Sequence, residues 1–378
     1  MIRVVADDRI PFLKGVLEPY TDVVYLPAEE INREALMQAD ALLVRTRTRC
    51  DEKLLTGTSV NFIATATIGY DHIDTEYCDR KGIRWVNAPG CNSSAVMQYL
   101  TAALLFISRR EKSPLPGRTL GIIGVGNVGS KVEKAGKILG MKVLLNDPPR
   151  KRREGSRKFI PLDILLKESD IVTLHVPLIK SGMDKTFHMI NRNTLDLMKK
   201  GAWLINTSRG EVAATSGLKE IIATGKLSGV ILDVWEREPK IDRRLFAGTE
   251  LGTPHIAGYS FDGKANGTAM IVKAFAEHFN VPLKDWYPAG VEKPEYPEIQ
   301  IDCKGMTAEE VIRKAVMHTY KINYDDAELR IYPRCFETCR ENYPFRREFP
   351  AYKVRLFNEI PGVAVQLKNL GFRLTRSR

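Results

Sequence analysis

Short runs of apolar residues alternate along this chain with longer segments that have helical periodicity. Four runs rich in valine, isoleucine and leucine come first: IRVVAD, ALLVRT, FIATAT and IRWVNA. Five more follow them: TLGIIGVG, KVLLND, IVTLHVP, AWLINTS and GVILDV. Strands that alternate with helices pair in parallel and are covered by those helices. The pattern therefore predicts an α/β protein with two parallel sheets, one from each set of runs.

Two helical segments indicate how these sheets are divided into domains. SSAVMQYLTAALLFISRR lies between the two sets of runs and should join the halves, leaving a cleft between them. FDGKANGTAMIVKAFAEHF places Ile271, Ala274 and Phe275 at helical spacing and is expected to cross back to the first sheet. The sequence therefore predicts a discontinuous substrate domain, residues 1–93 and 258–284, around a nucleotide-binding domain, residues 94–257.

The composition of the chain changes in the proline-rich stretch WYPAGVEKPEYPEI, which is typical of a domain boundary. A third domain is expected at residues 285–378. Thr307 and Glu310 have the spacing of a capping box and should open a helix. The end of the chain, AYKVRLFNEIPGVAVQLKNLGFRL, predicts strand, helix and strand. This domain has fewer than a hundred residues, which favours a docking or dimerisation module over an independent enzyme.

Composition narrows the class of protein. The chain has 378 residues, of which 44% are hydrophobic and 27% charged, as in ordinary soluble globular proteins. No apolar run is long enough to span a bilayer, and the opening MIRVVADDRIP does not resemble a secretion signal. We therefore expect a cytoplasmic protein without membrane contact. The six cysteines form no CxxC pair, so we expect reduced thiols and neither a disulfide framework nor a metal site.

The charge balance favours an anionic partner. Lysine and arginine outnumber aspartate and glutamate by 57 to 46, which gives a formal net charge of +11. The chain contains no zinc-finger, RRM or basic-zipper pattern, and its basic residues are dispersed except in PPRKRRE. We interpret that run as a solvated loop rather than a binding patch. A small phosphorylated acid fits the charge as well as nucleic acid does, and nucleic acid is not expected.

A glycine-rich loop, Gly124-Val125-Gly126-Asn127-Val128-Gly129, follows the run TLGIIG and precedes a helix. Glycines permit a tight turn and close approach of the backbone to a pyrophosphate, which the helix N-terminus attracts. The next run ends in Asp147, at the spacing expected for a carboxylate that binds an adenosine ribose. Because Asp147 would repel a 2′-phosphate, NAD is favoured over NADP, although the basic cluster at residues 150–153 weakens this preference.

Three polar residues follow the later apolar runs in fixed order. Arg209 lies in WLINTSRGEV, Glu238 in VILDVWEREP and His255 in ELGTPHIAGY. Arginine can grip a carboxylate with two parallel hydrogen bonds, histidine can accept a hydroxyl proton, and glutamate can orient the imidazole. Each residue alone has a purely structural explanation. Their order behind a nucleotide loop instead favours a dehydrogenase active site.

The motifs GVGNVG, LLNDPP, INTSRGEV, LDVWEREP and TPHIAGYS resemble those of the D-isomer-specific 2-hydroxyacid dehydrogenases. This resemblance implies that Arg209, Glu238 and His255 are catalytic. It also implies a Rossmann-type NAD domain, a flavodoxin-like discontinuous substrate domain and a small C-terminal α+β domain that forms a homodimer. By the same resemblance, Thr46, Thr67 and Tyr259 meet the substrate, and the cofactor is met by Val176, Thr207, Asp233 and Gly258.

Further segments, including TATIGYDHID, NAPGCNSSAV and RENYPFRREF, are similar to one branch of this family that oxidises a phosphorylated 2-hydroxy acid in vitamin B6 biosynthesis. A substrate phosphate needs cations, for which Arg45, Arg346 and Arg347 are candidates, with plain surface solvation as the alternative. Two other functions stay open at this point. One is oxidation of a different 2-hydroxy acid such as 3-phosphoglycerate, and the other is a non-catalytic NAD-sensing scaffold like the C-terminal-binding corepressors.

Overall fold

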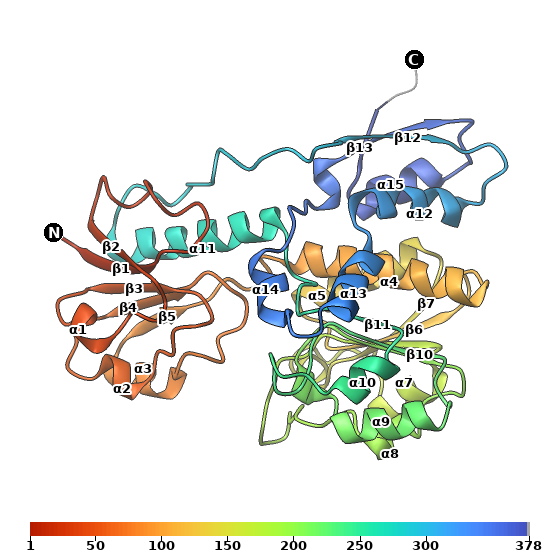
Figure 1. Cartoon of the computed structure of the whole chain (residues 1–378), viewed down its shortest axis with the longest axis horizontal. Coiled ribbons are helices and arrows are strands. Elements are labelled where there is room, and N and C mark those ends of the chain that lie inside the picture. The colour runs from red at the N-terminus through yellow and green to blue at the C-terminus, as the bar shows by residue number, and fades with distance from the viewer. Residues whose placement is uncertain (376–378) are drawn as a thin grey trace. The chain divides into compact units, whose positions relative to one another are not determined.

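The computed structural model describes residues 1–375, which divide into two compact units. Unit 1 is discontinuous and comprises Met1–Asn92 and Ser260–Glu292. Unit 2 comprises Ser93–Tyr259 together with the chain from Lys293 onward. Figure 1 shows both units and labels many of their helices and strands.

Unit 1 is built on a five-stranded parallel sheet with the order β2-β1-β3-β4-β5. This is the flavodoxin-like order, so the predicted fold class is confirmed for this unit. The sequence missed β2, an edge strand whose side chains are only partly buried. The elements are β1 (Arg3–Asp7), β2 (Asp22–Leu26), α1 (Arg33–Leu36), β3 (Ala41–Val44), α2 (Glu52–Leu55), β4 (Phe62–Thr65), α3 (Thr75–Lys81), β5 (Arg84–Val86) and α11 (Phe261–Phe279).

The two faces of this sheet bury separate hydrophobic clusters, because successive strand residues point to opposite sides. Val4 and Ala6 of β1 face the cluster that contains Phe275, whereas Val5 faces the other. Phe275 lies on α11, and its ring contacts that of Phe62 on β4 at a centroid distance of 6.0 Å. The predicted return of this late helix to the first sheet is thereby confirmed.

Unit 2 contains a six-stranded parallel sheet with the order β11-β10-β9-β8-β6-β7. A parallel bridge between Leu145 and Phe159 adds a strand position beyond β7, which completes the Rossmann order 3-2-1-4-5-6. The elements are α4 (Ser93–Glu111), β6 (Thr119–Ile123), α5 (Asn127–Ile138), β7 (Lys142–Asn146), α6 (Pro148–Glu154), α7 (Leu162–Glu168), β8 (Ile171–Leu174), α8 (Arg192–Leu195), β9 (Trp203–Asn206), η1 (Gly210–Val212), α9 (Thr215–Ala223), β10 (Gly229–Leu232), α10 (Arg243–Gly248) and β11 (Leu251–Gly252).

The central strands of this sheet are buried on both faces, which explains their unbroken apolar sequences. Every residue of β8, β9 and β10 is buried. Helix α4 packs in the core of the same unit, where Tyr99 and Leu104 are fully buried. The sequence of α4 is apolar over most of its length because the helix is buried within the unit. Within residues 1–375, no helix is long and apolar enough to cross a membrane.

The C-terminal part of unit 2 forms its own three-stranded sheet with the order β12-β13-β14. All three strands pair in parallel through helical connections, so this part has α/β connectivity where the sequence led us to expect α+β. The predicted strand, helix and strand at its end and the capping box of Thr307 and Glu310 are confirmed. The elements are β12 (Glu298–Asp302), α12 (Ala308–Thr319), α13 (Ile322–Ile331), α14 (Phe336–Glu341), η2 (Phe349–Ala351), β13 (Lys353–Phe357), α15 (Val363–Leu370) and β14 (Arg373–Leu374).

This C-terminal part shares a hydrophobic core with the nucleotide-binding sheet. Helix α12 lies alongside α4 (Figure 1), and Val311 and Val316 belong to the same cluster as Leu100 and Leu104. Buried Gln98 of α4 donates hydrogen bonds to the Thr319 hydroxyl and the Arg347 carbonyl, both at 3.0 Å. Residues 293–375 are therefore integrated into unit 2 rather than held by a linker alone.

The expectation of reduced thiols is wrong for one pair of cysteines. Cys335, which immediately precedes α14, forms a disulfide with Cys339 within that helix. Their Cα atoms lie 5.5 Å apart, because one helical turn brings positions four residues apart onto the same side. The free cysteines are all buried: Cys50, Cys78, Cys91 and Cys303. A search for CxxC spacing overlooks this pair, since its proximity depends on the helix.

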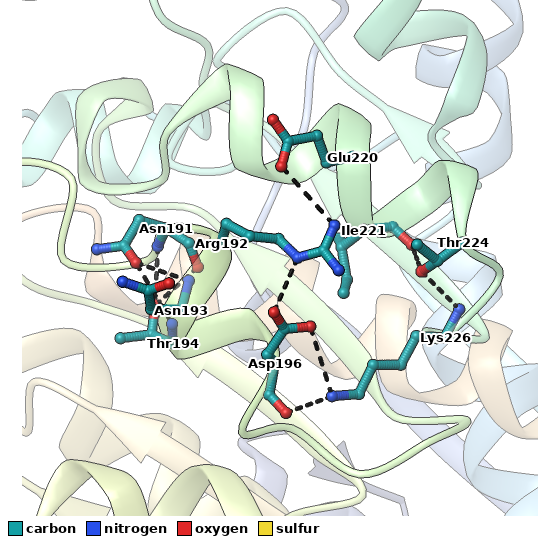
Figure 2. A network of polar contacts seen from close by, with 9 residues as sticks. All are labelled: Asn191, Arg192, Asn193, Thr194, Asp196, Glu220, Ile221, Thr224 and Lys226. Carbon is teal, nitrogen blue, oxygen red and sulfur yellow. Dashed lines mark hydrogen bonds and ion pairs between the residues drawn. The ribbon is translucent and has the colours of Figure 1, made fainter.

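A polar network on the surface joins α8 to α9 (Figure 2). The Asn191 side chain caps α8, and its own N–H donates to the Thr194 hydroxyl at 2.8 Å. Arg192 lies between the carboxylates of Asp196, at 2.8 Å, and Glu220, at 3.7 Å. Exposed ion pairs of this kind contribute about 0–1 kcal/mol each. The network therefore orients two short helices, while the buried strands provide most of the stability.

Candidate active site

The three predicted catalytic residues follow three neighbouring strands of the unit 2 sheet. Arg209 comes after β9, Glu238 after β10 and His255 after β11. These strands are adjacent and parallel, so their carboxyl ends lie at one edge of the sheet. Ligands of open α/β sheets bind at this edge.

His255 and Glu238 form a direct pair. The His255 Nδ1 and Glu238 Oε2 atoms are 2.7 Å apart, and Glu238 Oε1 accepts a hydrogen bond from the Trp235 N–H at 2.8 Å. Burial alone would raise the pKa of Glu238, but the charge and hydrogen bond of His255, together with the Trp235 N–H, lower it. Glu238 is therefore ionised at neutral pH and can only accept the hydrogen bond, so Nδ1 carries the proton. In the neutral form of the ring, the lone pair is therefore on Nε2, which can act as a base.

Asp233 fixes the segment that carries His255 through hydrogen bonds. This carboxylate is 1% exposed and accepts hydrogen bonds from the Thr253 hydroxyl at 2.7 Å and from the N–H groups of Ile256 at 2.8 Å and Ala257 at 2.9 Å. The His255 N–H also donates to the Asp233 carbonyl at 2.7 Å. The structure thus gives Asp233 a supporting role beneath the histidine, and its predicted contact with the cofactor stays a prediction.

Arg209 is held at the start of the short helix η1. Its Nη1 donates to the Ser208 carbonyl at 2.8 Å, and its own carbonyl accepts a hydrogen bond from the Asn206 side chain at 3.0 Å. The next residue, Gly210, lies so close to the end of β10 that an added Cβ would be 1.9 Å from the Trp235 carbonyl carbon. The arginine segment and the segment leading to Glu238 are therefore in direct backbone contact.

The glycine-rich loop fits a pyrophosphate. Gly124 has φ +85°, and an added Cβ there would be 2.5 Å from the His175 carbonyl oxygen. An added Cβ on Gly129 would be 2.0 Å from the Gly124 carbonyl oxygen, whereas one on Gly126 would meet nothing within 4 Å. Gly126 is the N-cap of α5 and provides no side-chain cap, so the first N–H groups of the helix, from Asn127 and Val128, remain available to an anion.

Asp147 has a structural task in addition to its predicted contact with ribose. One carboxylate oxygen accepts a hydrogen bond from the Val125 N–H at 2.8 Å, and the other accepts one from the Arg150 N–H at 3.0 Å. Asp147 therefore ties the glycine loop to the N-terminus of α6. The run PPRKRRE forms this helix, where we had expected a loop, and the Arg150 side chain turns toward Glu154 at 2.6 Å and the Val125 carbonyl.

The other predicted cofactor residues lie along the same strand ends. Val176 follows β8 and packs beside Gly124, while Gly258 follows the segment held by Asp233. The Thr207 hydroxyl lies 3.3 Å from Nδ1 of His175. Burial lowers the pKa of His175 to about 3, so this ring is neutral and structural.

The predicted substrate residues of unit 1 gather at the carboxyl ends of β3 and β4. Arg45 and Thr46 follow β3, and the Arg45 Nε lies 3.3 Å from the Asp7 carboxylate at the end of β1. Thr67 follows β4, and its hydroxyl lies 2.8 Å from that of Thr65. Neighbouring parallel strands therefore bring these residues to one edge of the first sheet.

Tyr259, the predicted substrate residue of unit 2, packs against the C-terminal part of the chain. Its ring meets that of Tyr343 edge to face at 5.8 Å, and the Arg340 guanidinium lies 5.8 Å from the Tyr259 ring centre. Sequence reasoning missed Arg340, since nothing in FETCRENY distinguishes it from a surface arginine. Arg346, a candidate for the substrate phosphate, is 4% exposed and donates to the main-chain carbonyls of residues 256 and 257. A buried guanidinium bound to main-chain carbonyls fits neither of the two expectations for Arg346, which were binding of the substrate phosphate and solvation at the surface.

Comparison with known proteins agrees with this geometry. Residues 106–257 match the family model described as D-isomer specific 2-hydroxyacid dehydrogenase, NAD binding domain. The chain is 45% identical over 355 residues to an erythronate-4-phosphate dehydrogenase from Bacteroides thetaiotaomicron, covering 93% of this chain and 99% of that one. The chain belongs to the D-isomer-specific 2-hydroxyacid dehydrogenase family. It is therefore an NAD-dependent oxidoreductase that acts on a CH–OH group.

More distant members of this family agree with the assignment. The erythronate-4-phosphate dehydrogenase of Yersinia pestis is 37% identical over 374 residues, covering 98% of this chain and 99% of that one. Among solved structures, a D-lactate dehydrogenase from Aquifex aeolicus in complex with NAD and lactic acid has a TM-score of 0.61 and 31% identity, and it covers 76% of this chain and 99% of its own. Residues 291–371 match a model described only as a domain of unknown function, DUF3410.

Two glycines of the loop make a matched test of its geometry. Gly129→Ala should lower the free energy of unfolding by about 1–3 kcal/mol, because the new methyl group meets the Gly124 carbonyl. Gly126→Ala should change it by less than about 1 kcal/mol, because its Cβ points into open space. That methyl group should instead weaken NAD binding. Urea unfolding without nucleotide and NADH fluorescence titration measure the two effects, and equal destabilisation by both variants would contradict this account.

The pair of Glu238 and His255 predicts a dependence of stability on pH. Glu238→Gln should lower the free energy of unfolding by about 1–2 kcal/mol at neutral pH, because a charge-assisted hydrogen bond is lost. The pKa of Glu238 is lowered in the folded state, so its contribution is present above the ordinary value of 4.5 and is lost as the pH falls through the folded value. The difference between wild type and variant should therefore shrink below that pH in urea unfolding, whereas exposed Glu277→Gln should show no such trend.

Proposed function

We propose that this protein oxidises 4-phospho-D-erythronate at C2 to 2-oxo-3-hydroxy-4-phosphobutanoate, a step of pyridoxal 5′-phosphate (vitamin B6) biosynthesis, with NAD as the oxidant. The observation that carries this proposal is the contact between His255 and Glu238. Both residues follow strands of the sheet that also contains β9, the strand that precedes Arg209. This contact occurs in a chain 45% identical to a protein named for this substrate. The overall change removes two hydrogens from the C2 alcohol and gives the ketone, NADH and a proton.

His255 takes the proton of the C2 hydroxyl. Its Nδ1–H donates to Glu238, so Nε2 carries the lone pair that receives the proton. Glu238 then stabilises the imidazolium, because its carboxylate is ionised and lies only 2.7 Å away. Trp235 and Asp233 keep the acid and the histidine segment in place through their main-chain hydrogen bonds.

Arg209 binds the substrate carboxylate, since a guanidinium can present two parallel N–H donors to it. NAD, when bound, supplies the nicotinamide ring that accepts the hydrogen of C2 with its electron pair. The residues that would hold it are those of the loop Gly124–Gly129, together with Asp147, Val176, Thr207, Asp233 and Gly258. Arg45, Thr46, Thr67 and Tyr259 complete substrate binding in this proposal, with Arg45 as the cation for the phosphate.

We also infer a cytoplasmic location and a homodimer formed through the C-terminal domain. Four buried free thiols suit a reducing compartment, although the disulfide of Cys335 and Cys339 is of a kind rare there. The outer face of the C-terminal sheet exposes Phe357 with 42% of its surface accessible, which provides an apolar contact for a second copy.

The reaction can be tested directly by NADH formation. The purified protein should reduce NAD with 4-phospho-D-erythronate and do so faster than with 3-phosphoglycerate. Arg209→Lys should retain NADH binding but lose on the order of 2–4 kcal/mol of transition-state stabilisation, because the two-pronged grip disappears. Arg192→Lys, on the surface of the same unit, is the matched control. Equal or higher efficiency with 3-phosphoglycerate, or near-normal turnover by Arg209→Lys, would refute the proposal.

The dimer can be tested by sedimentation of the full-length chain. Wild type should sediment as a dimer, and Phe357→Glu should shift it toward monomer by placing a charge in the proposed contact. Tyr20→Glu in unit 1 is the control, because Tyr20 is also 42% exposed. A variant at Phe357 that dimerises as well as wild type would rule out this face. Removal of residues 285–378 is a poorer test, since it also strips the shared core from unit 2.

A further inference from the structure

The segment that carries His255 begins at an edge of the unit 2 sheet. Strand β11 is the outermost strand, so its outward-facing N–H and C=O groups need partners from elsewhere. Helix α13 of the C-terminal part supplies them. The Asp326 carboxylate accepts a hydrogen bond from the Gly252 N–H at 2.7 Å, and Arg330 donates to the Thr249 carbonyl at 2.8 Å. The same two side chains pair with each other at 2.9 Å.

On the far side of His255, the C-terminal part makes a second attachment. Buried Arg346 donates to the Ala257 carbonyl at 2.6 Å and to the Ile256 carbonyl at 3.3 Å. Its guanidinium lies 4.5 Å from the ring centre of Tyr320, which donates to the Asp325 carboxylate at 2.8 Å. Arg346 is thus enclosed by aromatic and acidic groups of its own segment and directs its donors at the two residues that follow the histidine.

A third contact lies at Tyr259, four residues after the histidine. The Arg340 guanidinium of α14 lies 5.8 Å from the Tyr259 ring centre and pairs with Glu337 at 3.2 Å. The disulfide closes the turn of α14 next to this arginine. The C-terminal part therefore contacts the segment that carries His255 before the histidine, directly after it and at Tyr259.

These attachments matter because His255 has an unusual backbone conformation. Its φ is +57°, in the left-handed region that residues other than glycine adopt at a cost. Such a conformation persists only when the flanking backbone is held on both sides. Asp233 holds the flanks from within the sheet, and Asp326 and Arg346 hold them from outside.

We propose that the C-terminal part, residues 293–375, is a component of the catalytic centre that positions His255, with Arg346 and Asp326 as positioning residues. This inference rests on the proposed role of His255 as the base. It gives the domain of unknown function a task in catalysis that is separate from dimerisation. An imidazole displaced by about 1 Å loses on the order of a hundredfold in rate, so modest loosening of this segment is sufficient to impair turnover.

The test measures catalysis and cofactor binding separately in full-length variants. Arg346→Met and Asp326→Ala should each lower kcat by roughly 10- to 100-fold. Because neither residue belongs to the glycine loop, the Kd for NADH should stay within about twofold of wild type, that is, within about 0.4 kcal/mol. Arg346→Lys should recover part of the loss, since it keeps the charge but not the two-pronged donor. Arg355→Met, an exposed arginine on β13 of the same segment, is the matched control and should behave as wild type.

Two results would overturn the proposal. One is a kcat within twofold of wild type in both Arg346→Met and Asp326→Ala, and Asp326→Ala alone decides the matter if Arg346→Met fails to fold. The other is a loss of NADH affinity as large as the loss of kcat, which would show general loosening of unit 2. Wild-type turnover of 4-phospho-D-erythronate tests the proposed function separately. If another 2-hydroxy acid proves to be the substrate, the same variants are compared on that acid.

Discussion

One buried carboxylate underlies the site. Asp233 receives hydrogen bonds from a hydroxyl and two N–H groups of the segment that contains His255, and it is almost completely removed from solvent. Burial raises the pKa of this group, so its retention in the core depends on those donors. Without them, an unsatisfied acid would lie in an apolar sheet. The hydrogen bonds of Asp233 fix the backbone on both sides of His255. They thereby maintain the left-handed conformation of His255 and its contact with Glu238.

Two acids beside one histidine thus have different tasks, and their surroundings separate them. Asp233 is enclosed and bound to main-chain donors, whereas Glu238 is partly accessible and bound to the imidazole. The pKa of the first is raised and that of the second is lowered. An ionised Glu238 fixes the proton on Nδ1 of His255, which leaves the opposite nitrogen as the base. The assignment of roles follows from burial and hydrogen bonding, since the two side chains carry the same functional group.

Much of the fold and the core of the site could be predicted from the sequence. The nine apolar runs mark buried parallel strands, and the residues after β9, β10 and β11 include the three proposed catalytic groups. The sequence could not predict β11 itself, since two residues show no periodicity. It also did not distinguish Arg346, which lies in the basic segment RENYPFRREF but is buried beside the Tyr320 ring and donates to the carbonyls of residues 256 and 257. Strand β11 and the burial of Arg346 both depend on contacts between residues far apart in the sequence. Such contacts cannot be inferred from the local pattern of a single sequence.

The attachment of Asp147 has a consequence for the choice between the two nicotinamide dinucleotides. The carboxylate that should discriminate against an extra phosphate on the ribose also holds Val125 in the glycine loop and caps α6. Exchanging this acid for a neutral residue to admit NADP would therefore release the glycine loop that we propose to bind the pyrophosphate. In this chain, selectivity and loop shape share one side chain, so a change of coenzyme requires a second substitution that restores the lost acceptor.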